Sequence, residues 1–268
     1  LTNKDLFKDY CIKNGVDVVE SYIVDDNFLT SEIKNIEYPV IIKPADGRAS
    51  KGITLCYTKS EVLEAVDYAL IFSDRKKILC ERYMLKPEVA VKYFVCDGHI
   101  YLTSMSDIYT SFSNGKRDYI WTQIFPSKFY SVFKEYTDKR LRQLIRKLGI
   151  KNGPLSFSGF VDGEKFRFID PSFRMGGAQD WRIVNHITGI NISEMMTNYA
   201  LTGKMIDNPI INDFDGEFSK KSSAMLYFLA KEGKIHRIDG LDKAILHEDV
   251  IGYHICHEEG STINDKYT

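Results

Sequence analysis

The feature that most constrains this chain is a single lysine at the end of an apolar run, followed at once by a small loop that contains glycine. Residues 39–43 read Pro-Val-Ile-Ile-Lys, the loop covers 45–52, and a second β-like run covers 53–57. A strand that presents one cation beside such a loop can bind a polyphosphate, because the lysine supplies charge and the loop supplies backbone N–H groups. The alternative is a core strand that ends in a solvated Lys-Pro turn, and this stretch alone favours neither interpretation.

Composition narrows the function classes. The chain has 268 residues, enough for one large domain or two small lobes, and its formal net charge is -1. We expect neither nucleic acid nor a membrane as partner, because no basic excess and no bilayer-length apolar run is present. The five cysteines are odd in number and form no C-x-x-C pair, which favours a reduced, cytoplasmic setting over a disulfide framework or a zinc site.

Apolar periodicity and turn signals predict a mixed order of helices and strands. The first helix begins with the capping pattern Thr2-Asn3-Lys4-Asp5 and ends at Gly15, and Asp162-Gly163-Glu164 is typical of a hairpin turn. Residues 106–131 indicate a loop or an irregular hairpin. The predicted strands are 39–43, 53–57, 77–82, 88–95, 99–105, 155–162 and 165–170, with a β-rich stretch from Ser222. The other predicted helices are 58–72, 134–148, 179–188 and 191–202.

Four blocks carry chemistry near predicted strand ends or a helix start. The first is Thr2-Asn3-Lys4, and the second is the Lys43 stretch with its loop. The third covers 78–88, with acids at its fourth and last positions. The fourth covers 168–177 and reads Phe-Ile-Asp-Pro-Ser-Phe-Arg-Met-Gly-Gly.

In this order and at these spacings the blocks resemble the ATP-grasp superfamily, whose members include D-alanine–D-alanine ligase, biotin carboxylase and carbamoyl-phosphate synthase. The resemblance covers nearly the whole chain. It implies an α+β ATP-grasp fold with two α/β lobes, a small lid lobe at 1–84 and a large C-terminal lobe at 85–268, and the nucleotide between them. It also implies that the N-terminal domain which normally precedes the first ATP lysine is absent, so we expect an excised or truncated domain.

The same resemblance assigns roles to single residues. The residues it assigns to ATP are Lys4, Lys43, Gly47, Ser50, Gly52, Glu81, Tyr83, Met84 and Glu88, with 47–52 as the lid, the hinge acid at adenine and Glu88 at the ribose. Those it assigns to Mg²⁺ are Asp170 and Ser172. Those it assigns to substrate are Arg174, Gly176, Gly177 and Arg182, with Arg174 and Lys43 as the catalytic pair. Lys116 or Arg117 is a further candidate cation over the phosphates.

The chemistry of the fourth block supports these roles independently. Mg²⁺ prefers hard oxygen ligands, usually one or two carboxylates together with phosphate oxygens, and Asp170 is presented by a β run just before a glycine-bearing turn. Arg174 suits a planar oxyanion such as a carboxylate or an acyl phosphate. The alternatives are a turn residue for Asp170 and a surface charge for Arg174, and the other three blocks favour the functional interpretation.

Three positions depart from the family pattern. Ser158 stands where a second acidic or amide metal ligand is usual, and Ser172 stands where asparagine is usual. Ala49 occupies a lid position that is often glycine. Serine is a weak neutral ligand, so either Asp170, water and phosphates hold the metal, or metal binding is impaired.

The sequence therefore predicts an ATP-dependent carboxylate–amine ligase domain that uses ATP and Mg²⁺. A small-molecule carboxylate, or bicarbonate, would be activated as an acyl phosphate and attacked by an amine or another nucleophile. A homodimer is compatible with the sequence. The alternatives are a non-catalytic ATP-binding module with a degraded metal site and a structural α/β domain without a ligand.

Overall fold

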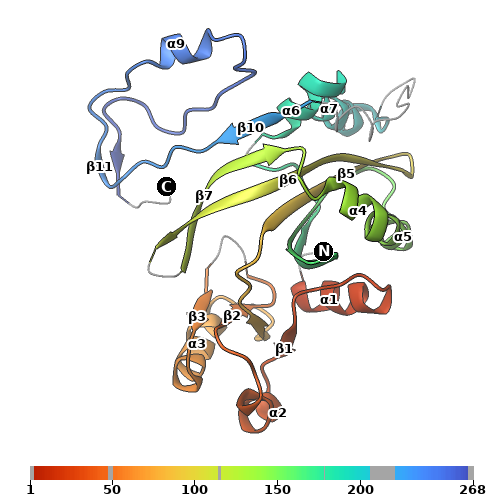
Figure 1. The fold of residues 1–268 in the computed structure, drawn as a ribbon, viewed down its shortest axis with the longest axis vertical. Coiled ribbons are helices and arrows are strands. Elements are labelled where there is room, and N and C mark those ends of the chain that lie inside the picture. The colour runs from red at the N-terminus through yellow and green to blue at the C-terminus, as the bar shows by residue number, and fades with distance from the viewer. Residues whose placement is uncertain (1–2, 48–50, 114–115, 178, 206–220, 265–268) are drawn as a thin grey trace.

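The computed structural model describes residues 3–47, 51–113, 116–177, 179–205 and 221–264, and its strands form two main antiparallel sheets (Figure 1). The smaller sheet has the order β1-β4-β2-β3. Its strands are β1 (Ser21–Ile23), β2 (Val40–Pro44), β3 (Thr54–Cys56) and β4 (Ile78–Arg82). Helix α3 (Lys59–Ile71) packs its Val62, Ala65 and Ala69 against this sheet.

The larger sheet has the order β10-β7-β6-β5-β8-β9, so the hairpin partners along the chain are also neighbours in space. Its strands are β5 (Glu88–Cys96), β6 (His99–Ser113), β7 (Lys116–Phe125), β8 (Gly153–Asp162), β9 (Lys165–Ser172) and β10 (Ser223–Leu226). Because β5 alternates between faces, Val89, Val91 and Tyr93 belong to one apolar cluster and Phe94 to another.

Helices cover both faces of the larger sheet (Figure 1). One face carries α4 (Tyr130–Tyr136) and α5 (Asp138–Lys147), and the other carries α6 (Trp181–Thr188) and α7 (Ile192–Thr202). The remaining elements are α1 (Lys4–Lys13), α2 (Asp26–Thr30), a 3₁₀ turn (Glu32–Lys34), α9 (Leu241–Ile245), β11 (Gly233–Lys234) and β12 (Thr262–Ile263). None of the described helices is both long enough and apolar enough to cross a bilayer.

Helix boundaries follow the capping signals in the sequence. The Thr58 hydroxyl accepts a hydrogen bond from the Glu61 backbone N–H at 3.3 Å, which begins α3 as predicted. Asn191 does the same for α7, and this helix ends at Gly203, whose φ of 75° is the left-handed conformation that glycine favours.

Three sequence predictions need correction. Residues 106–131 contain most of a long hairpin, because β6 continues to Ser113 and β7 follows; the irregularity lies in register shifts near Thr110. The helix predicted at 134–148 is two helices that meet at Thr137. The stretch from Ser222 is mostly irregular in its described part, with only short strands.

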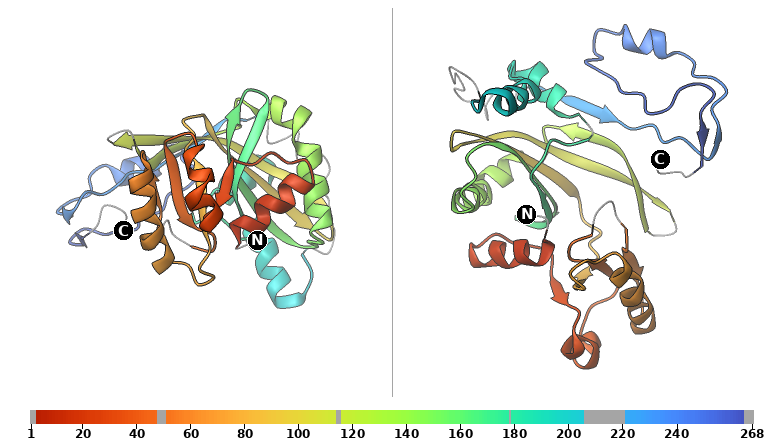
Figure 2. Two further views of the ribbon diagram at one scale, coloured as in Figure 1. Left: turned by 90° about the horizontal axis from the view of Figure 1, so that it is seen from below. Right: turned by 180° about the vertical axis from the view of Figure 1, so that it is seen from behind.

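Helix α1 lies between the two sheets, which is visible from the back of the molecule (Figure 2, right). Phe7 packs on Phe157 of the larger sheet with the ring centroids 6.1 Å apart. At the start of the same helix, the Lys4 backbone N–H donates to Ala45 O, just after β2, at 2.9 Å. The helix therefore connects the smaller sheet to β8 and β9.

Candidate functional site

Lys43 and Glu81 lie side by side on one face of the smaller sheet. In the β2–β4 register Ile41 pairs with Glu81, so Lys43 is the diagonal neighbour two residues along. The Lys43 ammonium forms an ion pair with Glu81 Oε2. The two side chains are 5% and 4% exposed, so this pair is shielded from solvent and water does little to screen it.

Lys8, a residue that the sequence analysis did not single out, approaches Glu81 from α1. Its Nζ donates to Glu81 Oε1 at 2.7 Å and to Val19 O at 2.8 Å, and its side chain is 3% exposed. The available signal was its position one helical turn after Lys4, on the same face as the buried Phe7. A lysine on an apolar helix face needs an anionic partner.

Asp170 completes the group from the larger sheet. Its Oδ1 lies 3.7 Å from the Lys43 Nζ, although these residues belong to different sheets. The Asp170 Oδ1 atom is buried and accepts no hydrogen bond, while the side chain as a whole is 42% exposed. The site thus holds a carboxylate oxygen that is withdrawn from water and only loosely paired.

Electrostatics keeps Lys43 charged. Burial alone would lower the pKa of Lys43, but the carboxylates of Glu81 and Asp170 outweigh it and raise that pKa above its usual value. Burial raises the pKa of Glu81, but the ammoniums of Lys43 and Lys8 reverse this and lower it. For Lys8 burial dominates and lowers the pKa, although the Glu81 carboxylate opposes it.

Lys4 contacts the beginning of the predicted lid loop. Its Nζ donates to Gly47 O at 2.8 Å. A Cβ atom on Gly52, at the other end, would lie 2.9 Å from the Phe72 and Pro44 side chains, and the φ of Gly52 is +73°, so this position requires glycine. Ser50 and Ala49 lie outside the described residues.

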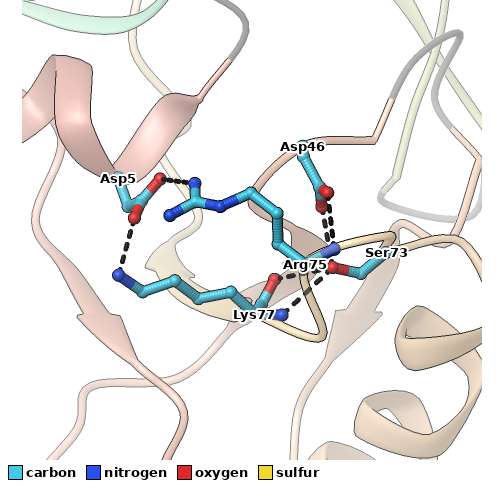
Figure 3. Close-up of polar contacts among 5 residues, drawn as sticks. All are labelled: Asp5, Asp46, Ser73, Arg75 and Lys77. Carbon is cyan, nitrogen blue, oxygen red and sulfur yellow. Dashed lines mark hydrogen bonds and ion pairs between the residues drawn. The ribbon is translucent and has the colours of Figure 1, made fainter.

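A network of ion pairs and hydrogen bonds fixes the start of that loop (Figure 3). Asp5 of α1 receives Arg75 Nη1 at 3.0 Å and pairs with Lys77 Nζ at 2.6 Å. Asp46 accepts the Ser73 hydroxyl at 2.7 Å and the Arg75 backbone N–H at 2.9 Å. Burial raises the pKa of Asp5, but its bonds to Lys77 and Arg75 lower it on balance.

The predicted hinge offers backbone and apolar surface. The Tyr83 backbone N–H donates to Pro39 O at 3.1 Å. Met84 is buried in a small cluster with Val19 and Phe160, and the half-buried Ile169 packs against it. The two oxygens of Glu81 are already engaged by lysines, and Glu88 is half-buried at the start of β5.

The metal edge carries serines beside its carboxylate. In the β8–β9 register Ser158 pairs with Asp170, and Ser156 pairs with Ser172. Among the described residues, no group of three or more His, Cys, Asp or Glu side chains is placed to hold a metal ion. Asp170 is therefore the carboxylate on which a metal at this edge would depend.

The glycine-bearing turn after β9 leads to a second ion pair. Lys92 of β5 pairs with Asp180, and a Cβ atom on Gly176 would lie 3.0 Å from Asp180 Oδ1. Gly176 therefore fits the close approach of this pair to the turn. The exposed Arg174 donates to Met175 O at 3.0 Å.

Two further predicted cations and a glycine sit at the edges of this site. Arg182 covers the ring of Trp181, with its guanidinium carbon 5.5 Å from the ring centroid. Gly177 is exposed in the turn. The side chains of Lys116 and Arg117 lie outside the described part of the chain.

Comparison with protein families gives one match across most of the chain. The model described as "Carbamoyl-phosphate synthase L chain, ATP binding domain" matches residues 3–206. Dapdiamide A synthase of Enterobacter agglomerans is 22% identical over 161 residues, which are 57% of this chain and 37% of that protein. The ATP-grasp enzyme fsqD of Aspergillus fumigatus is 25% identical over 182 residues, 65% of this chain and 31% of that protein. The chain thus spans about a third of the length of these curated relatives.

Solved structures show the same fold at low sequence identity. The L-amino acid ligase from Bacillus licheniformis is 20% identical with a TM-score of 0.75, over 98% of this chain and 63% of that one. The biotin carboxylase domain dimer of 2-oxoglutarate carboxylase from Hydrogenobacter thermophilus, a complex with MgADP, ADP and bicarbonate, is 19% identical with a TM-score of 0.68. It matches over 83% of this chain and 49% of that one.

Proposed function

This chain belongs to the carbamoyl-phosphate synthase L chain ATP-binding domain family and has the ATP-grasp fold, and from this premise we propose that it is an ATP-dependent ligase domain. It would activate a small-molecule carboxylate, or bicarbonate, as an acyl phosphate for attack by an amine or another nucleophile. The observation that carries the proposal is the meeting of Lys43 and Asp170 from two different sheets, with 3.7 Å between Nζ and Oδ1.

Within this proposal Lys43 and Lys4 hold the phosphates of ATP. Lys43 is suited to this because its pKa is raised and its charge is retained at neutral pH. Lys4 is suited because it already lies against the loop at Gly47. The loop of 47–52 as a lid stays a prediction.

The base and the ribose take the hinge. The backbone at Tyr83 and Met84, together with the apolar cluster around Met84, offers a surface for adenine. Glu88 is assigned to the ribose hydroxyls. The adenine contact of the Glu81 carboxylate stays a prediction, because both of its oxygens are held by lysines in this structure.

Asp170 fits a metal that arrives with the nucleotide. Its Oδ1 is buried without a hydrogen bond, which is the property of a ligand awaiting a cation, and one carboxylate suffices when phosphates supply other ligands. Ser172, on the neighbouring residue pair, is the second assigned ligand. When bound, Mg²⁺ would neutralise charge on the phosphate oxygens.

The chemical step needs positioning and charge neutralisation more than covalent help from the protein. A carboxylate oxygen of the substrate would attack the γ-phosphorus and ADP would leave. The amine would then attack the acyl carbon and phosphate would leave. Arg174 would stabilise the transferring phosphoryl group, and Gly176, Gly177 and Arg182 would border the substrate.

A second candidate is a non-catalytic ATP-binding module. The observation in its favour is the pairing of Ser158 with Asp170 and of Ser156 with Ser172, which leaves the metal edge with one carboxylate in this register. Under this alternative ATP would bind without phosphoryl transfer.

Incubation of the full-length parent protein with ATP, Mg²⁺ and pools of carboxylates and amines tests the two candidates. Release of ADP and phosphate that depends on both pools supports the ligase. ATP binding without release under any acceptor supports the module, and absence of ATP binding contradicts both.

A further inference from the structure

The contact between α1 and the two sheets contains three buried charges in a row. Lys8, Glu81 and Lys43 are each at most 5% exposed, and Glu81 gives one carboxylate oxygen to each lysine. The row carries one negative and two positive charges, so it has a net charge of about +1 while every member is ionised. The excess positive charge faces Asp170, since Lys43 is the lysine that approaches it.

The two lysines have different surroundings. Lys8 is closed off by Glu81 and by the Val19 carbonyl, to which it donates at 2.8 Å. It points at no unpaired group. Lys43, in contrast, borders the partly exposed Asp170 side chain, where a ligand has access.

We propose that Lys8 is a positioning residue that neutralises Glu81, so that the charge of Lys43 remains available to a polyphosphate. This inference rests on the proposed function, because it concerns the same ATP site. Without Lys8, the single negative charge of Glu81 would cancel the single positive charge of Lys43. The phosphates would then meet a neutral pair instead of a net cation.

Charge balance gives this role a signature that ordinary packing lacks. Lys8→Met should weaken ATP binding although Lys8 is buried away from the ligand. Lys8→Met combined with Glu81→Gln should restore binding, because Lys43 is again uncompensated. Adjacent residues whose effects depend on one another in this way are resolved by a double-mutant cycle.

The test is calorimetric titration of the full chain with Mg-ATP and, separately, with adenosine. We expect Lys8→Met to weaken Mg-ATP binding about tenfold and adenosine binding less than twofold, since the lost charge acts on phosphates. The double variant should bind Mg-ATP within about threefold of wild type. Lys13→Met is the matched control, an exposed lysine on the same helix, and should leave both affinities unchanged.

Each outcome decides. A double variant that binds Mg-ATP no better than Lys8→Met overturns the inference, and so does an equal loss for Mg-ATP and adenosine. If Lys8→Met fails to fold, which circular dichroism detects, the double variant still decides, because it leaves no buried carboxylate short of a partner. It then supports the inference at near wild-type affinity and overturns it at a tenfold loss. A wild-type chain that binds no ATP contradicts the proposed function itself.

Discussion

Two buried carboxylates in this molecule are each held between cations, Glu81 at the contact of the two sheets and Asp138 at the start of α5. Asp138 is satisfied on all sides: Tyr93 Oη donates to it at 2.6 Å, Lys134 Nζ at 2.7 Å and Arg142 Nε at 2.9 Å. Burial raises the pKa of Asp138, but these partners outweigh it and lower the pKa. The pKa of Glu81 is lowered for the same kind of reason.

A shifted pKa therefore does not distinguish these two regions, because structural ion pairs and functional sites both produce one. What distinguishes them is the next group outward. Beyond Glu81 and Lys43 lies Asp170 Oδ1, buried without a hydrogen bond, whereas each oxygen of Asp138 accepts at least one. We infer that the first region serves a ligand and the second serves the fold.

Asp138→Asn gives the largest expected effect and tests the structural half of the comparison. Removing one partner of a buried ion pair costs about 3 kcal/mol, because the charges left behind lose their compensation. We expect urea unfolding to show this loss while the affinity for Mg-ATP stays within twofold of wild type. An Asp138→Asn variant that folds as well as wild type but loses ATP binding would reverse the assignment of the two regions.

Lys43→Met tests the functional half. We expect about a hundredfold weaker Mg-ATP binding, roughly 2.7 kcal/mol, because the cation nearest to the phosphates is removed. Titration calorimetry measures it, with Lys134→Met as the matched control, a lysine bound to the structural carboxylate. An equal loss of ATP affinity in the control would show that the effect comes from general destabilisation.

Asp170→Asn addresses the unpaired oxygen. The variant removes the carboxylate on which a metal would depend, so we expect Mg²⁺ to lose most of its influence on ATP affinity, about a tenfold change. Binding of ATP in the presence of a chelator should be unchanged or tighter, because a negative charge 3.7 Å from Lys43 is gone. The measurement is the ATP dissociation constant with and without Mg²⁺. A variant with the wild-type dependence on Mg²⁺ would show that Asp170 is not a metal ligand.

Local sequence signals predicted the parts of the site that depend on short-range rules. The apolar run ending at Lys43 is β2, and the Asp162-Gly163 turn joins β8 to β9. The fold class follows from the order of these elements. The break at Thr137 was missed because neither proline nor glycine marks it, and the register shifts near Thr110 obscured the period of two in β6.

The pairing of Lys8 with Glu81 could not be predicted in this way. The two residues are 73 positions apart, and their contact depends on where α1 lies relative to both sheets. For this reason the sequence assigned Glu81 to adenine, without a view of the two lysines that engage its oxygens. The loose pairing of Asp170 Oδ1 is likewise a product of tertiary packing.

The pH dependence of stability gives the smallest effect and separates Asp138 from its variant. Its folded pKa is lowered, so its contribution is present above the unfolded value of about 3.9 and is lost as the pH falls through the folded value. The difference in unfolding free energy between wild type and Asp138→Asn should therefore be constant near neutral pH and shrink below about pH 4. Urea titrations at pH 7, 5 and 3 measure it. A difference that stays constant down to pH 3 would mean that the Asp138 charge contributes nothing, and that the variant acts through the geometry of its hydrogen bonds.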